Sequence, residues 1–156
     1  PNIKLLLVGP YESDINPISD HTRSVIDSED SILSTGYSTR VKYYLELANS
    51  CIFPSHREGF PNVPLQAGAM ECPLICSQIG GNIDIVTDGK TGLLHKVQDA
   101  LDLAEKMEFA LENPKEMMKL ARQLREKIHA DFQRSVIQEH IKDEYLALYY
   151  KNSHTA

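Results

Sequence analysis

The sequence predicts an α/β fold in which short parallel strands form a doubly wound sheet, with helices packed on both of its faces. Three observations support this fold class. Short apolar, β-rich runs alternate with segments whose apolar residues have helical spacing. The first run, residues 3–8, is almost continuously apolar, which is typical of a strand covered on both faces. Glycine or proline stands at the ends of these runs, where turns begin.

The first third of the chain is expected to form two strand–helix units. The strand at residues 3–8 ends at a glycine–proline pair. A helix is expected at 17–28, because the proline that opens this segment suits the first turn of a helix. A strand at 31–35 stops at a glycine, and residues 39–48 carry apolar side chains at helical spacing.

The middle of the chain continues this alternation. Loops are expected at residues 55–61 and 78–82, each between a strand and a helix. Ligands of parallel sheets bind beyond the carboxyl ends of the strands, so these two loops, with residues 9–16 and 36–39, are expected to form the site. The strands are expected at 51–54, 73–77 and 92–95. The helices are expected at 62–70 and from just after Gly80-Gly81 to about residue 88.

The last third is expected to be helical. Asn113 is expected at the N-cap position of one helix, with Pro114 in its first turn. The helical segments have the amphipathic patterns of a scaffold. A polar tail is expected at 151–156, after helices at 99–112, 114–129 and 133–150.

Composition and charge exclude several classes of protein. The 156 residues suffice for one domain with a buried core. Sixteen basic and 22 acidic residues give a net charge of -6, and no basic cluster suggests binding to nucleic acid. No apolar run is long enough to span a membrane and no signal peptide opens the chain, so a cytoplasmic location is expected. The start at Pro1, just before an apolar run, is expected of a piece cut from a longer polypeptide.

The cysteines are expected to be buried and reduced. Cys51, Cys72 and Cys76 are odd in number and lie inside apolar segments. If residues 73–77 form a strand, the ends of the Cys72–Cys76 segment lie roughly 13 Å apart, which is too far for a disulfide.

The loop that joins the third strand to the next helix is the most informative stretch. Pro61 and Pro64 are tolerated only before a helix or in its first turn, where their missing amide hydrogens would be unpaired anyway. A helix start near Asn62 follows, and its free amides and positive dipole end favour a phosphate. Glu58 would lie beside such a phosphate-linked group. Alternatively, Arg57 and Glu58 form a solvated pair that caps the helix.

The second loop has a similar pattern. Gly80-Gly81 precedes a helix, and glycines there let the backbone approach a ligand closely. The alternative is a tight strand-to-helix turn. No clustered Asp/His set calls for a metal, and His56, in the 55–61 loop, is expected to have no special function.

Several motifs occur in the order and spacing of one known family. The segment Pro54-Ser55-x-x-Glu58-Gly59-Phe60-Pro61-Asn62-Val63 continues to Ala67-x-Ala69-Met70 and Pro73-Leu74-Ile75. Further matching segments are Leu5-Leu6-Leu7-Val8-Gly9, Thr35-Gly36-Tyr37, Gly80-Gly81-Asn82-Ile83-Asp84-Ile85-Val86 and Asp88-Gly89-Lys90-Thr91-Gly92-Leu93-Leu94. Together these segments resemble the signature of the family 4 retaining glycosyltransferases, enzymes with the GT-B fold of two Rossmann-like domains facing a cleft. The likeness covers nearly the whole chain, so residues 1–150 are expected to form the C-terminal, nucleotide-sugar-binding domain, without its first strand.

The resemblance implies a role for each matching position. Glu58 is implied as the catalytic residue that contacts the transferred sugar and the phosphate region of the donor. The second glutamate of the family's pair is replaced here by Gln66, which is expected at the ribose. An amide offers one acceptor oxygen and a donor nitrogen, whereas a carboxylate accepts from both ribose hydroxyls. The implied donor-sugar and phosphate residues are Gly59, Phe60, Asn62, Gly80 and Gly81, and the implied nucleobase residues are Gly36, Tyr37 and Ser38.

The implied reaction moves a sugar from a nucleoside diphosphate sugar to a hydroxyl of a glycan or lipid-linked acceptor, with retention at the anomeric carbon. The resemblance implies no metal or other cofactor. It assigns the acceptor pocket to an N-terminal domain, and the basic pair that neutralises the diphosphate to positions upstream of residue 1. The chain alone is therefore expected to bind nucleotide weakly and to transfer nothing.

Two alternatives stay open. The same fold also serves isomerases and hydrolases of nucleotide sugars, and the glutamine at position 66 could mark a degenerate domain that only binds. A peripheral location of the parent enzyme at the inner face of a membrane also stays open.

Overall fold

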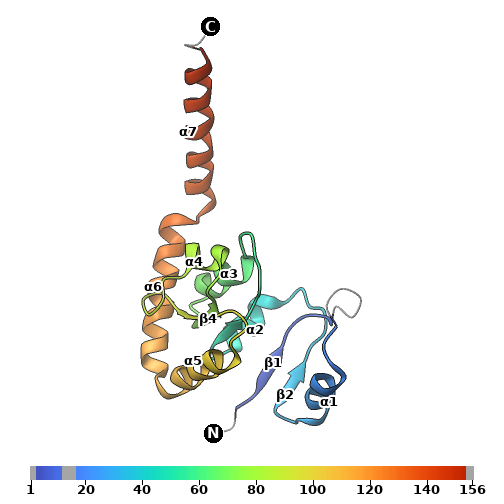
Figure 1. Ribbon diagram of the computed structural model, residues 1–156. Coiled ribbons are helices and arrows are strands. Elements are labelled where there is room, and N and C mark those ends of the chain that lie inside the picture. The colour runs from blue at the N-terminus through green and yellow to red at the C-terminus, as the bar shows by residue number, and fades with distance from the viewer. Residues whose placement is uncertain (1–2, 12–16, 154–156) are drawn as a thin grey trace. The chain divides into compact units, whose positions relative to one another are not determined.

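The computed structural model describes residues 3–11 and 17–153 (Figure 1). The chain divides into two compact units, Pro1–Tyr44 and Leu45–Ala156, and each is described by itself. In both units the strands are parallel and helices follow them in sequence. The expected α/β class is therefore confirmed, with the strands hydrogen-bonded as one pair and one trio.

The first unit is built on a parallel strand pair. Strand β1, Leu5–Leu7, pairs in register with β2, Ile32–Ser34, and helix α1, Asp20–Ser28, connects them. Helix α1 begins three residues after the expected proline, because the hydroxyl of Ser19 accepts a hydrogen bond from the amide of Thr22 at 3.1 Å and so caps the helix.

Strand β1 differs from expectation in its environment. It was expected to be covered on both faces, but Leu5 and Leu6 are 38% and 39% exposed. Helix α1 packs against β2 and leaves much of the strand pair uncovered. An apolar run of this kind shows that a strand is present, whereas the extent of its burial depends on how many elements pack against it.

The second unit contains a three-stranded parallel sheet in the order β3-β4-β5. Helix α2, Val41–Leu47, precedes it. The register places the carboxyl ends of the three strands at one edge of the sheet, as the expected site requires. The elements are β3 (Cys51–Phe53), α3 (Asn62–Ala69), β4 (Leu74–Ser77), α4 (Gly80–Ile85) and β5 (Leu93–His95).

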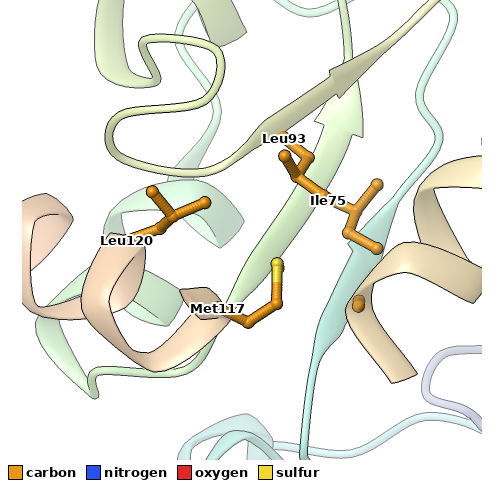
Figure 2. Packing of buried hydrophobic residues seen from close by; sticks show 5 residues of the cluster. Ile75, Leu93, Met117 and Leu120 are labelled. Carbon is orange, nitrogen blue, oxygen red and sulfur yellow. The ribbon is translucent and has the colours of Figure 1, made fainter. Parts of the chain in front are cut away.

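The core of the second unit lies between the sheet and two C-terminal helices, α5 (Ala100–Glu112) and α6 (Pro114–Asp131). Figure 2 shows Ile75 and Leu93 of the sheet beside Met117 and Leu120 of α6. Each of these side chains is at most 7% exposed, and burial of such a side chain contributes about 1.5–3 kcal/mol. Packing against the sheet therefore holds α6 in position.

Helix α6 also supports α3. A Cβ atom on Gly68 of α3 would overlap the Ile128 side chain and lie 2.6 Å from Cγ of Leu124. The absence of a side chain at Gly68 thus allows the two helices to approach closely. Because α3 begins at the 55–61 loop, α6 braces the element that carries the candidate site.

The junction between α5 and α6 corrects one expectation. Asn113 occupies the N-cap position of α6, and Pro114 lies in its first turn, as expected. The Asn113 side chain, however, does not cap α6. Its Nδ2 donates to the carbonyl of Phe109 at 2.9 Å and so satisfies the carboxyl end of the preceding helix.

The final helix, α7 (Arg134–Ser153), runs into the expected polar tail, of which residues 151–153 are helical. It was expected to act as scaffold, but between residues 134 and 151 Val136 is half-buried and every other residue is exposed. Its exposed apolar residues include Ile137, Ile141 and Leu148. Within the described ranges, no helix is both long and apolar enough to cross a membrane.

All three cysteines are free, as expected, and two of them, Cys72 and Cys76, are fully buried. Burial raises the pKa of Cys51 to about 12, with a further increase from the neighbouring Cys72. Burial also raises the pKa of Cys72 to about 11 and that of Cys76 to about 12.

These pKa values predict slow thiol chemistry and a loss of stability in alkali. At pH 8, alkylation by iodoacetamide is expected to be at least about 100-fold slower in the folded protein than in guanidinium chloride, because the thiolate is the reactive form.

Since folding raises each pKa above its ordinary value of 9.0, the thiols stabilise the fold fully below about pH 9. This contribution is lost as the pH rises towards 12. Mass spectrometry of alkylated protein and urea titrations across this range check both results. Labelling at equal rates with and without guanidinium would contradict the prediction.

Candidate functional site

The start of α3 is the centre of the candidate site. The helix begins at Asn62, as expected, and Pro61 occupies the N-cap position with extended backbone angles. No described side chain caps this end, and the first turn contains no acidic residue. Pro64 has no amide hydrogen, so the amides of Asn62 and Val63 are the donors that the helix start can offer to an anion.

Glu58 is held in the loop that precedes this helix. Its Oε1 accepts a hydrogen bond from the Ser55 hydroxyl at 2.7 Å, and the side chain is half-buried. Among the described residues, neither Glu58 nor Arg57 caps α3. The capping alternative is therefore wrong. The carboxylate is positioned by its own loop, four residues before the first residue of the helix.

The two candidate loops lie against each other. A Cβ atom on Gly81 would overlap the carbonyl oxygen of Gly59 and lie 2.8 Å from Cδ of Pro61. At Gly80, by contrast, an added Cβ would have no described atom within 4 Å. Neither glycine has a positive φ, so Gly81 is required by this close approach and not by a turn conformation. The structure thus brings together Gly59, Pro61 and Gly81.

Buried polar groups fix the strand ends beneath these loops. The Asn82 side chain is fully buried, and its Nδ2 donates to the carbonyl of Ser77 at 2.8 Å. The Ser77 hydroxyl lies 3.3 Å from Nε2 of His95 and 3.4 Å from the carbonyl of Phe53. Nδ1 of His95 donates to the carbonyl of Lys96 at 2.8 Å. This network links the carboxyl ends of β3, β4 and β5.

Sequence reasoning missed Ser77 and His95 as parts of the site's support. Each is the last residue of a strand, and a polar residue at the end of an apolar strand is the signal that could have found them. Asn82 had been noted only as the end of a loop and as part of a motif. Its Oδ1 is buried without a partner among the described residues.

The remaining candidates of the second unit lie on or near α3. Asn62 and Gln66 are four residues apart on this helix and are both exposed, so they share one face. Phe60 is 53% exposed, and its ring centroid lies 5.7 Å from that of Phe132, at the end of α6. This ring pair was not foreseen from the sequence.

The three nucleobase candidates belong to the first unit and are described by themselves. Gly36 has a φ of +64°, and its carbonyl accepts a hydrogen bond from the amide of Gly9 at 3.0 Å. Tyr37 is 77% exposed, and the Ser38 hydroxyl accepts from the amide of Arg40 at 3.1 Å. Tyr37 is thus available to a planar ligand. A hollow of about 470 Å³ in the same unit is lined by Arg40, Tyr43 and Tyr44.

The chemistry open to this site is binding and electrostatic stabilisation of an anion. Uncapped amides, a fixed carboxylate and a close-lying glycine loop suit a phosphate group attached to a polar ligand. Within residues 3–11 and 17–153, no group of three or more His, Cys, Asp or Glu side chains is placed to hold a metal ion.

Parallel strands with the candidate loops at their carboxyl edge define a Rossmann-like domain of the type found in GT-B glycosyltransferases. The chain belongs to the family described as "Glycosyl transferases group 1", whose family model matches residues 1–128. The expected family resemblance is confirmed at this level.

Relatives and solved structures agree with this assignment. The capsular polysaccharide biosynthesis glycosyltransferase CapM of Staphylococcus aureus is 28% identical over 144 residues, which are 92% of this chain and 38% of CapM. Anabaena HepE in complex with UDP superposes with a TM-score of 0.84 at 16% identity, over 94% of this chain and 42% of HepE. Sucrose-phosphate synthase from Thermosynechococcus elongatus gives 0.78 at 30% identity, over 95% and 39%. The chain therefore spans about two fifths of the length of these relatives.

Proposed function

We propose that this chain is the donor-binding half of a retaining glycosyltransferase of family 4. The observation that carries the proposal is the uncapped start of α3, with Glu58 held in the loop that precedes it and Gly81 packed on the same loop. A nucleoside diphosphate sugar matches this arrangement, because its diphosphate is an anion and its sugar is rich in hydroxyls. Crystal structures of HepE with UDP and with UDP-glucose support this class of donor.

In the proposed reaction, the bond between the anomeric carbon and the diphosphate oxygen breaks while an acceptor hydroxyl bonds to that carbon, and the hydroxyl proton passes to the departing diphosphate. Negative charge then builds on the departing nucleoside diphosphate. The amides of Asn62 and Val63 stabilise this charge, since they are already oriented before the reaction. Glu58 contacts the transferred sugar. The remaining contacts with the donor are made by Gly59, Phe60, Gly80 and Gly81.

The nucleoside part of the donor is assigned to exposed residues. Gln66 contacts the ribose from the same face of α3 as Asn62, and Gly36, Tyr37 and Ser38 contact the nucleobase. A separate N-terminal domain supplies the pocket for a glycan or lipid-linked acceptor. The parent enzyme acts in the cytoplasm, at or near the inner face of a membrane.

A backbone substitution tests the role of the α3 start in nucleotide binding. Asn62→Pro removes one amide hydrogen at a position where proline suits a helix, and Asn62→Ala removes the same side chain but keeps the amide. Calorimetry on the full-length protein, titrated with UDP, GDP and ADP, is expected to find one that binds. For that nucleotide, Asn62→Pro is expected to weaken binding about 10- to 100-fold relative to Asn62→Ala, as for a hydrogen bond to a charged group. Equal affinities of the two variants, or no binding of any nucleotide, would overturn the proposal.

A further inference from the structure

We infer that Phe132 is a positioning residue for the 55–61 loop and acts through the ring of Phe60. The inference rests on the proposed function only for its effect on the donor, because the contact itself is structural. The two ring centroids are 5.7 Å apart and the ring planes are inclined by 45°. This lies within the range of favourable aromatic pairs.

Phe132 is well placed to hold another group because its own backbone is fixed. It is the C-cap residue of α6, and its amide donates to the carbonyl of Ile128 at 3.0 Å. Ile128 is buried, and its side chain fills the space that the absent side chain of Gly68 leaves on α3. The ring of Phe132 therefore extends from an end of α6 that is anchored on α3, the helix that follows the 55–61 loop.

The residues on either side of Phe60 hold the loop backbone through other contacts, so the Phe60 side chain needs a partner of its own. The preceding residue, Gly59, has no side chain and contacts Gly81 through its carbonyl. The following residue, Pro61, is buried and is the N-cap residue of α3. Between them, the Phe60 side chain is 53% exposed, and the Phe132 ring packs against it.

Two residues that are assigned to the donor lie in the loop at this ring pair. Phe60 is one of the residues assigned to the donor sugar and phosphate, and Glu58 lies two residues before it. If the Phe60 ring loses its support, both groups move with the loop backbone. Donor binding should then weaken, whereas binding of the acceptor, assigned to the other domain, should not change.

The test is a double-mutant cycle on the full-length protein with the nucleotide that binds. Phe132→Ala is expected to weaken nucleotide binding and raise the donor KM about 3- to 10-fold, with the acceptor KM unchanged. Phe132→Tyr keeps the ring and is expected to restore both values. Phe60→Ala and the double variant are expected to show the same loss as each other, because the contact is already broken in either single variant. Phe109→Ala, which removes a half-exposed phenylalanine from α5, is the matched control and is expected to leave the donor KM unchanged.

Hydrogen exchange of the backbone amides of residues 55–60 adds a readout that needs no ligand. Faster exchange in Phe132→Ala than in Phe109→Ala is expected. If the wild-type protein binds no nucleotide, the proposed function fails, and exchange still tests the positioning. The inference is overturned if loop exchange in Phe132→Ala equals that of the control, or if losses from Phe60→Ala and Phe132→Ala simply add.

Discussion

Replacing Glu58 with glutamine is expected to lower kcat on the order of 100-fold in the full-length protein, with a smaller change in nucleotide affinity. The substitution removes the negative charge proposed to lie beside the transferred sugar. It keeps an amide oxygen that can still accept the 2.7 Å hydrogen bond from Ser55. The loop should therefore stay in place while the interaction with the reacting sugar is lost. Steady-state rates with saturating donor measure the effect.

Ser55→Ala is the matched control for Glu58→Gln. It removes the hydrogen bond to the carboxylate but leaves the charge, and it is expected to lower kcat less than about 10-fold. A normal turnover in Glu58→Gln would favour the alternative of a domain that only binds nucleotide. Equal losses in both variants would show that Glu58 acts by shaping the loop and not by contacting the sugar.

Replacing Gly81 with alanine is expected to lower the free energy of unfolding by about 1–3 kcal/mol and to weaken nucleotide binding as well. The new methyl group would overlap the carbonyl oxygen of Gly59, which is backbone and cannot rotate away as a flexible side chain can. One of the two loops must therefore move. Urea denaturation and calorimetric titration measure the two effects.

The neighbouring glycine provides the control for Gly81→Ala. In Gly80→Ala, the added methyl group meets no described atom within 4 Å, and a small gain in stability is expected, because alanine favours the helical conformation. If Gly80→Ala and Gly81→Ala destabilise the protein equally, the effect comes from backbone conformation and the proposed contact between the loops is wrong.

Much of the fold could be predicted because its signals are local. The strand at 73–77 and the helix at 62–70 agree with β4 and α3 to within one residue at each end. Prolines and glycines mark these boundaries, and their effects depend only on neighbouring backbone atoms. The start of α3 at Asn62 was predictable for this reason.

The features that failed or were missed depend on distant residues. Asn113 has the sequence signature of an N-cap, but its side-chain nitrogen donates to the carbonyl of Phe109 in the preceding helix and its side chain does not cap α6. Periodicity predicted α7 but could not show whether anything covers it.

The support of the site was equally hidden from the sequence. The buried Ser77–His95 contact joins two strands, and the Phe60–Phe132 contact joins a loop to a helix end. The strand-end positions could have indicated Ser77 and His95 one by one, but spacing in one sequence does not show which residues of either pair contact each other. Gly81 was predicted to lie at the site because a glycine lets the backbone approach a ligand closely. The structure shows that it also lies against the carbonyl of Gly59.

Helix α6 has a mechanical consequence for the site. Its 18 residues span about 27 Å, with Met117 and Leu120 fixed in the sheet core near one end and Phe132 against the loop at the other. A helix of this length is stiff. A small tilt of α6 about the end that carries Met117 therefore displaces the end that carries Phe132 by a larger distance. Substitutions in the core around Met117 should thus lower donor affinity before they unfold the domain, so donor affinity is a sensitive measure of core packing.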